Sequence, residues 1–242
     1  MTSQIDRLWP SPASALDDDA LLDAYAFGAD GGLRMNFVTS LDGAATRDGV
    51  SGALGGDADG RVFELIRRLA DVVLVGAGTV RAEGYDAMRL DDDAVAWRTA
   101  HGFAPQPTFA IVSRSLNLDP ESAVFADATV RPIVYGSREA DSARAAALGE
   151  VADVVLDDDP VAVRSDLRAR GLTRIHSEGG PSLFGSFVAD GVVDELCLTA
   201  APTLEAGGAR RISTSPEASP TGMRLVTVLR SGDELLLRYA AA

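Results

Sequence analysis

Hydrophobic residues follow two alternating patterns along most of the chain. Short apolar runs closed by glycine, proline or polar residues are typical of buried β-strands. They occupy residues 33–43, 71–78, 107–113, 130–136, 151–157, 172–178 and 193–202. Apolar residues spaced three and four positions apart are typical of amphipathic helices. They occupy residues 57–71, 138–150, 160–171 and 180–191. Strands that alternate with helices predict an α/β fold, in which a mostly parallel sheet carries helices on both faces.

The two ends of the chain depart from this alternation. Residues 223–240 hold two apolar runs around Ser231-Gly232-Asp233, which predicts an antiparallel hairpin at the edge of a mixed sheet. Residues 1–30 are rich in Asp, Ala, Ser and Pro, which indicates an extension that either packs on the domain or stays partly mobile. We therefore expect one domain over residues 31–242, a size at which a single core can be buried.

Composition restricts the kinds of ligand. The net charge of −14 argues against nucleic acid and anionic membranes as partners. No apolar run approaches the roughly 20 residues of a membrane span, and no secretory signal opens the chain, so we expect a cytoplasmic protein. All 22 basic residues are arginine, which excludes chemistry that requires lysine, such as Schiff bases and the Walker P-loop. Two histidines and one cysteine, none at ligand spacing, argue against a zinc or other metal site.

Short aspartate runs also occur along the chain. Those at 91–93 and 157–159 are interpreted as solvated loop charges.

The strongest candidate site is Ser177-Glu178-Gly179-Gly180-Pro181, between a predicted strand and a predicted helix. Pro181 suits the first helical turn, and the glycines suit a tight connection whose free N–H groups could hold phosphate. An ordinary glycine-rich turn explains the glycines about equally well. Glu178 favours a ligand site, because an acid beside a phosphate is unfavourable unless it serves a neighbouring substrate.

Three further features are weaker. Gly76-Ala77-Gly78-Thr79 begins like a dinucleotide fingerprint, but Arg81 replaces its third glycine. It could still hold a pyrophosphate opposite the first turn. Asp42 ends the first predicted strand, where spacing alone favours an ordinary turn. Arg67 and the arginine after it fit a solvated helix face, although an acidic protein that binds an anion must recruit some of its arginines.

Three segments in this order and spacing carry a specific resemblance. They are "MNFVTSLDGAAT", "LADVVLVGAGTVRAEGY" and "IHSEGGPSLFGSFVADGVVDELCLTAAP". Together they resemble the C-terminal reductase domain of bifunctional riboflavin-biosynthesis deaminase/reductases, in the dihydrofolate-reductase-like superfamily. Stand-alone actinobacterial pyrimidine reductases and dihydrofolate-reductase-like proteins are the most similar variety. The resemblance covers residues 33–240 and implies a three-layer fold, a homodimer and NADPH as the cofactor. The deaminase half is not implied, because one cysteine cannot supply its zinc signature.

The resemblance also implies roles for individual positions. Val38 and Thr39 would line the nicotinamide, Glu83 would lie near the ribose, and Ser113 with Arg114 would contact the 2′-phosphate of NADPH. The remaining cofactor positions would be Ala53, Gly76, Gly78, Thr79, Gly179, Gly180, Pro181, Ser182, Leu183, Phe184, Gly185 and Ser186. Substrate would be held by Ser51, Arg67, Arg89 and Glu178.

The family reaction reduces 5-amino-6-(5-phosphoribosylamino)uracil by hydride transfer to ribose C1′, and we expect Glu178 or Asp42 to manage the proton. The chain departs from the family at Ala53, where a tryptophan-containing block is usual, and at Tyr85, where a proline is usual. These departures keep two alternatives open. One is reduction of dihydrofolate or another pterin, and the other is a regulatory NADPH-binding protein with little turnover.

Overall fold

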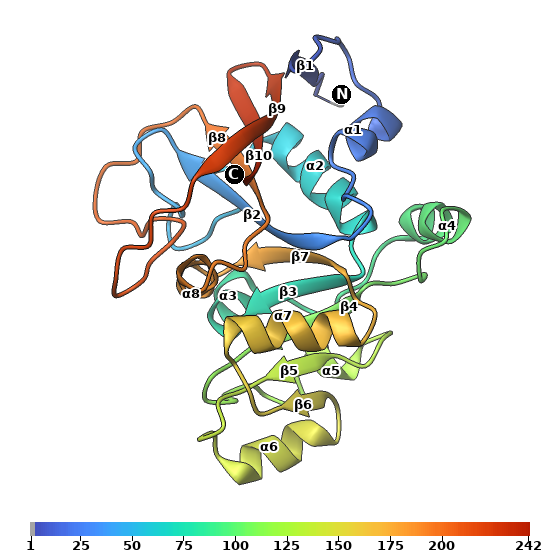
Figure 1. Ribbon diagram of the computed structural model, residues 1–242, viewed down its shortest axis with the longest axis vertical. Helices are drawn as coiled ribbons and strands as arrows, with labels where there is room; N and C mark the ends of the chain where they lie inside the picture. The colour runs from blue at the N-terminus through green and yellow to red at the C-terminus, as the bar shows by residue number, and fades with distance from the viewer. Residues whose placement is uncertain (1–2) are drawn as a thin grey trace.

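The computed structural model describes residues 3–242, whose strands form one 10-stranded sheet (Figure 1). The strands are β1 (Asp6–Trp9), β2 (Gly32–Ser40), β3 (Val72–Gly76), β4 (Thr108–Val112), β5 (Ile133–Tyr135), β6 (Asp153–Val155), β7 (Arg174–Gly179), β8 (Glu195–Ala201), β9 (Met223–Ser231) and β10 (Glu234–Ala241). The helices are α1 (Asp18–Ala24), α2 (Asp57–Arg68), α3 (Ala77–Glu83), α4 (Asp92–Ala100), α5 (Ala123–Ala126), α6 (Ser142–Gly149), α7 (Pro160–Ala169) and α8 (Pro181–Ala189).

The sheet is mixed and mostly parallel. Its strand order is β1-β9-β10-β8-β2-β7-β3-β4-β5-β6. Every neighbouring pair from β8 to β6 is parallel, whereas β10 lies antiparallel to β8 and to β9. The predicted fold, including the C-terminal antiparallel hairpin, is confirmed. Because the parallel strands point the same way, their carboxyl ends lie along one edge, where α/β sheets bind ligands.

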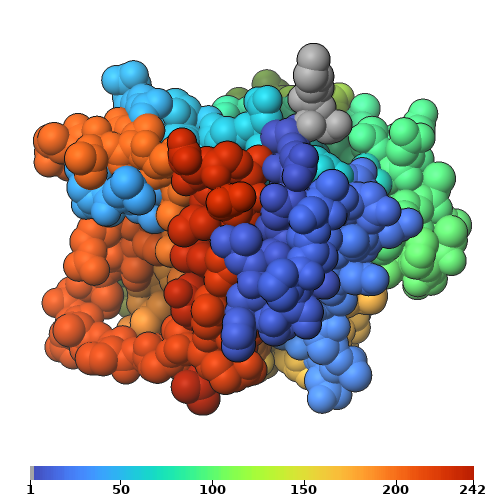
Figure 2. All heavy atoms as spheres, turned by 90° about the horizontal axis from the view of Figure 1, so that it is seen from above, coloured from blue at the N-terminus to red at the C-terminus, as the bar shows by residue number. Residues whose placement is uncertain are grey.

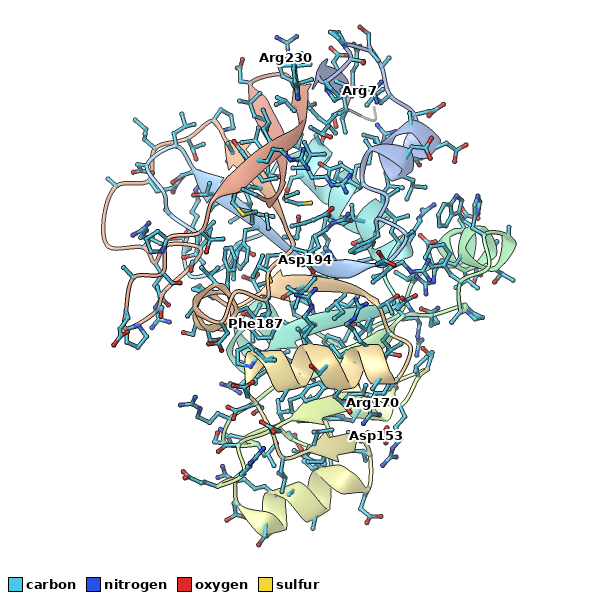
Figure 3. All side chains as sticks on the ribbon, in the orientation of Figure 1. Arg7, Asp153, Arg170, Phe187, Asp194 and Arg230 are labelled. Atoms are coloured by element: carbon cyan, nitrogen blue, oxygen red, sulfur yellow. The ribbon has the colours of Figure 1, made fainter. Side chains whose placement is uncertain are left out.

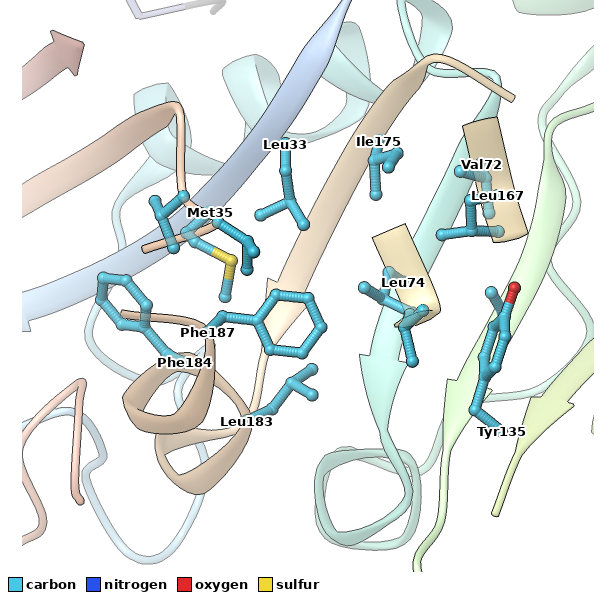
Figure 4. Packing of buried hydrophobic residues seen from close by; sticks show 14 of the residues in the cluster. Leu33, Met35, Val72, Leu74, Tyr135, Leu167, Ile175, Leu183, Phe184 and Phe187 are labelled. Atoms are coloured by element: carbon cyan, nitrogen blue, oxygen red, sulfur yellow. The ribbon is translucent and has the colours of Figure 1, made fainter. Parts of the chain in front are cut away.

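Helices cover both faces because successive strand residues point to opposite sides. On one face, Leu33, Met35 and Leu74 pack against apolar residues of α7 and α8 (Figure 4). On the other face, Val73 and Val75 pack against α3, α5 and α6. Helices α1 and α2 cover the strands at the hairpin end of that second face. The result is the expected three-layer arrangement.

Surface ion pairs tie α7 and the residues after it to the edge of the sheet. Arg170, just beyond α7, lies beside Asp153 of β6, with Nη1 3.1 Å from Oδ2 (Figure 3). The same guanidinium binds Asp166, which accepts a hydrogen bond of 2.7 Å from the Tyr135 hydroxyl. These contacts hold α7 against β5 and β6.

The N-terminal segment packs on the sheet. β1 pairs antiparallel with β9, and Asp6 lies opposite Arg230. Ile5 and Leu21 are buried with Cys197 of β8 and Leu229 of β9. Figure 2 shows this segment, in blue, against the red C-terminal hairpin. Residues 3–30 therefore add an edge strand and a helix to the sheet.

Both aspartate runs lead into helices, which corrects the assignment to loops, whereas the predicted solvent exposure of residues 91–93 is confirmed. Asp91 accepts a 2.7 Å hydrogen bond from the Ala94 N–H and caps α4, a helix that the weak amphipathic pattern did not predict. Asp159 accepts the N–H groups of Val161 and Ala162 and caps α7. Aspartate is favoured at such positions because its carboxylate satisfies otherwise free N–H groups. None of the helices within residues 3–242 has the length and apolar character to cross a membrane.

Candidate active site

A large cavity of about 1950 Å³ opens along the carboxyl ends of the parallel strands. Its walls include Val38 of β2, Gly76 of β3, Val112 of β4 and Glu178 of β7. Loops that follow β2, β3, β6 and β8 complete it. The cavity volume is roughly twice the upper end of the usual range for a single small-ligand pocket, about 1,000 Å³, and the cavity spans four neighbouring strands.

Two glycine turns meet in the middle of this cavity because β3 and β7 are neighbours. A Cβ atom on Gly76 would lie 3.5 Å from the Gly179 carbonyl oxygen, and one on Gly180 would lie 3.1 Å from Thr79 Oγ1. Gly179 and Gly180 have φ angles of +102° and +113°, which L side chains rarely adopt. A Cβ on Gly179 would also lie 2.9 Å from the Phe37 ring. Both backbone conformation and space therefore require glycine at this turn.

The start of α8 faces the cavity. Pro181 occupies the first turn, and no side chain caps the helix. Ser182 and Leu183 line the cavity, and N–H groups at these helical positions have no acceptor within the helix. The start of this helix is thus suited to an anionic group such as a phosphate.

Glu178, the last side chain before the glycine turn, is held by Arg67 of α2. Arg67 Nε and Nη2 donate to its two carboxylate oxygens at 2.5 and 2.8 Å, and the Tyr85 hydroxyl donates to Oε2 at 2.8 Å. The Glu178 side chain is 0% exposed and that of Arg67 is 16% exposed. The Arg67 guanidinium also lies over the Phe63 ring at 4.2 Å.

The protonation states of this cluster follow from its geometry. Burial by itself would raise the pKa of Glu178, but the charge and hydrogen bonds of Arg67 lower it to about 2. Burial lowers the pKa of His176, whose two ring nitrogens have no hydrogen-bond partner. Burial and the adjacent Glu178 raise the pKa of Tyr85. At neutral pH the cluster contains a carboxylate, a guanidinium, a neutral imidazole and a neutral phenol.

Asp42 lies in the loop after β2 and not in the cavity wall. Its carboxylate accepts hydrogen bonds from the Ser40 hydroxyl and from the N–H groups of Glu205 and Ala206. The Ser40 hydroxyl and these N–H groups lower the pKa of Asp42 to about 2. Asp42 thus ties the β2 loop to the β8 loop, as the turn interpretation anticipated, and its position does not support a role as the catalytic acid.

The other expected cofactor residues divide into two groups. Those that line the cavity are Val38, Gly76, Gly78, Thr79, Glu83, Arg114, Gly180, Pro181, Ser182, Leu183 and Ser186. Those that do not are Thr39, Ala53, Ser113, Gly179, Phe184 and Gly185. Phe184 belongs to the core, where its ring stacks on Phe37 at 4.9 Å, and Ser113 is buried beside Tyr135. These two residues support the cavity wall from behind.

Of the expected substrate residues, Ser51, Arg67 and Glu178 line the cavity. Ser51 donates its N–H to Glu83 Oε1 at 2.8 Å. Arg89 lies elsewhere, because its Nη2 donates to the Asp127 carbonyl at 2.8 Å and the residue is absent from the cavity wall. The structure therefore does not bring Arg89 to the site where the resemblance places it.

Sequence reasoning missed two features of the cavity. Asp59 and Phe63 precede Arg67 at intervals of four, so one face of α2 reaches the cavity, and this spacing was visible in the sequence. At the opposite end, Arg138 and Arg114 pair with Asp157 and Asp158 in the cavity wall. The sequence held no signal for these pairs, because they come from different loops.

Comparison with known proteins identifies the family. The sequence profile of the RibD C-terminal domain matches residues 32–237. The chain belongs to this family. The resemblance drawn from the three motifs is thereby confirmed.

Two relatives differ in how much of their length this chain matches. RibD of Mycobacterium tuberculosis is 32% identical over 151 residues, which are 62% of this chain and 42% of that protein. The chain thus matches less than half of that relative. The 2,5-diamino-6-ribosylamino-4(3H)-pyrimidinone 5′-phosphate reductase of Methanothermobacter thermautotrophicus is 26% identical over 215 residues, 85% of this chain and 95% of that protein.

Solved structures support the same placement. A pyrimidine reductase-like protein of Corynebacterium diphtheriae superposes with a TM-score of 0.80 at 28% identity, covering 88% of this chain and 92% of the other. The deaminase/reductase of Thermotoga maritima has a TM-score of 0.68 at 22% identity, covering 88% of this chain and 57% of the other. At that identity the second comparison shows the fold alone.

Proposed function

We propose that the protein is an NADPH-dependent reductase of riboflavin biosynthesis, which reduces a phosphoribosylamino-pyrimidine such as 5-amino-6-(5-phosphoribosylamino)uracil. One observation carries the proposal. A single cavity contains both the glycine turn at the start of α8 and the buried Arg67–Glu178 pair, so two ligands can meet beside Glu178. The name of the Methanothermobacter thermautotrophicus reductase, 95% of whose length is matched by this chain, supports the substrate class.

The residues of the cavity fit a dinucleotide. Gly180 leaves room for a phosphate beside Thr79, and the first-turn N–H groups of α8 supply donors. Arg114 and Arg138 offer positive charge at the other end, as a 2′-phosphate requires. NADPH, when bound, supplies the hydride. The chain's own contribution is to orient the two ligands and to manage one proton.

Arg67 and Glu178 suit the positioning of substrate. Glu178 is ionised and fully engaged, so it orients the Arg67 guanidinium rather than giving up a proton. Arg67 Nη1 has only a 3.5 Å contact with Glu64 and retains donor capacity toward the cavity. This assignment replaces the expectation that Glu178 or Asp42 supplies the proton.

NADPH oxidation with three substrates tests the proposal. The three substrates are 5-amino-6-(5-phosphoribosylamino)uracil, the 2,5-diamino-pyrimidinone phosphate named for the Methanothermobacter reductase, and dihydrofolate, each at the same concentration. We expect turnover with either pyrimidine and none with dihydrofolate. Arg67→Ala should abolish turnover of the pyrimidine. Arg81→Ala, on α3 outside the cavity, should leave that turnover unchanged. Turnover with dihydrofolate alone would favour a pterin reductase. NADPH binding without any oxidation would favour a regulatory role.

We further propose that the protein is a homodimer, as the family resemblance implies, and that it is cytoplasmic. Sedimentation of the purified full chain, with and without NADPH, measures the first of these. A mass of one chain at micromolar concentration would contradict the dimer.

A further inference from the structure

Asp59 of α2 lines the cavity. It lies on the same helix face as Phe63 and Arg67, four and eight positions further on, and all three line the cavity. The helix rises about 1.5 Å per residue, so Asp59 lies roughly 12 Å along the axis from Arg67. The face thus carries a carboxyl group at one end and a guanidinium at the other.

The surroundings of Asp59 differ from those of three other acids in the cavity wall, each of which pairs with an arginine. Glu178 pairs with Arg67, Asp157 with Arg138 and Asp158 with Arg114. Asp59 has no ion pair among residues 3–242, and Arg61, two positions along, pairs with Asp18 instead.

A second carboxylate, that of Glu234, lies against the backbone just before α2, where the Asp59 carboxyl also lies. A Cβ on Gly55 would lie 2.1 Å from Asp59 Oδ2, and the Gly56 N–H donates to Glu234 Oε1 at 2.9 Å. Glu234 of β10 is buried, as is Thr199 of β8, whose hydroxyl faces Asp59. The Asp59 and Glu234 carboxyls therefore flank two adjacent glycines, in a place where both are poorly hydrated.

The electrostatics agree with this geometry. Burial raises the pKa of Asp59 to about 6, the Thr199 hydroxyl opposes the shift, and Glu234 adds to it. The remaining titratable group that interacts with Asp59 is the Tyr25 hydroxyl, at the end of α1. Among residues 3–242, neither Glu234 nor Tyr25 is cationic, so neither favours the charged form of Asp59. A proton is therefore retained at Asp59 at pH values where Glu178 and Asp42 have lost theirs.

We propose that Asp59 is the proton donor of the reduction, an inference that rests on the proposed function. The ring-opened substrate has a C=N bond between ribose C1′ and the nitrogen on pyrimidine C6. C1′ accepts the hydride, the nitrogen accepts the Asp59 proton, and the C=N bond becomes CH₂–NH. NADPH is oxidised to NADP⁺, the imine is reduced, and the Asp59 carboxylate regains a proton from water.

Asp59→Asn tests the donor directly, because asparagine keeps the size of the side chain and removes the proton. We expect kcat to fall by about 10²-fold, as is typical for loss of a general acid. The wild type should lose activity as the pH rises above about 6, which gives its pH profile an alkaline limb. The pH profile of the variant should lack this alkaline limb. Asp57→Asn, in the same helical turn but outside the cavity wall, is the matched control and should retain wild-type activity and pH profile.

Two measurements separate the donor from a structural role. Glu234→Gln keeps an acceptor for the Gly56 N–H and removes the neighbouring charge, so the alkaline limb should move to lower pH. Carbon-13 titration of the Asp59 carboxyl in the free enzyme should give a midpoint near 6. A midpoint near 4, or Asp59→Asn turnover within threefold of wild type, would overturn the assignment of Asp59 as proton donor and leave the proposed function intact. A wild type that reduces neither pyrimidine would overturn the proposed function itself.

Discussion

The guanidinium of Arg67 donates two hydrogen bonds, of 2.5 and 2.8 Å, to the carboxylate of Glu178. The two residues are 111 positions apart and come from α2 and β7. Since the Glu178 side chain is fully buried, its charge is compensated chiefly by this one partner. We therefore expect this pair to contribute to the stability of the fold as well as to the shape of the cavity.

Arg67→Ala should destabilise the protein strongly. Removal of one partner leaves a buried charge uncompensated, which typically costs about 3–5 kcal/mol of unfolding free energy. Urea denaturation at neutral pH measures this loss of unfolding free energy. The Arg67→Ala/Glu178→Gln double variant should recover part of the loss, because the uncompensated carboxylate is gone. Arg81→Ala should change stability by less than about 0.5 kcal/mol. Equal stability of the single and double variants would contradict the assignment of the cost to the buried charge.

Asp59→Asn should stabilise the protein at alkaline pH. The folded-state pKa of about 6 exceeds the ordinary value of 3.8, so the folded protein binds more protons between these values. The wild type therefore loses stability as the pH rises from about 4 to 6. The uncharged asparagine avoids this loss.

The Asp59→Asn variant should gain about 1–3 kcal/mol at pH 8 and almost nothing at pH 4. Chemical denaturation at the two pH values measures the difference, and it needs no substrate. Asp57→Asn should show no comparable gain at pH 8. A variant less stable than wild type at pH 8 would show that the Asp59 carboxylate is not strained in the fold.

Gly185→Ala should displace the loop after β8. A Cβ at Gly185 would lie 1.9 Å from the Thr214 carbonyl oxygen, although alanine is intrinsically better than glycine within a helix. Thr214 also donates its N–H to the Pro181 carbonyl at 2.9 Å, so the loop rests on the first turn of α8. The steric conflict with backbone outweighs the helical preference.

We expect Gly185→Ala to lose about 1–3 kcal/mol of stability and to bind NADPH more weakly. Thermal unfolding and cofactor titration measure the two effects. Gly149→Ala is the matched control, because Gly149 also lies in a helix and a Cβ there would meet nothing within 4 Å. That control should be neutral or slightly stabilising. Wild-type stability of Gly185→Ala would show that the loop does not pack here as described.

Arg114→Ala and Arg138→Ala should impair the use of NADPH more than that of NADH. Both guanidinium groups lie in the cavity wall and are largely exposed, paired only with Asp158 and Asp157. If they read a 2′-phosphate, each variant should raise the KM for NADPH by about tenfold, which corresponds to about 1.4 kcal/mol. The KM for NADH should stay unchanged and serves as the internal control. An equal rise for both cofactors would indicate a general effect on the cavity.

Much of the fold was determined by local sequence alone. Apolar runs and helical spacing predicted all seven parallel strands and the helices α2, α6, α7 and α8, because each such element must bury one face or stripe. The Gly179-Gly180-Pro181 turn was likewise predictable, since positive φ and a first-turn proline restrict the residue types. The elements at residues 6–9, 18–24, 77–83, 92–100 and 123–126 were not predicted, because short segments gain their stability from the tertiary contacts they make.

The chemistry of individual side chains was decided by tertiary structure. The sequence indicated Glu178, Arg67 and Asp42 as candidate site residues and did not indicate Asp59. The protonation state of a carboxylate depends on the groups that lie within a few ångströms of it. Arg67 keeps Glu178 ionised, and the loop after β8 fixes Asp42. Burial beside Glu234 lets Asp59 retain its proton. Local pattern fixes where the backbone turns, whereas the charge state of a buried group is set by partners that only the folded chain brings together.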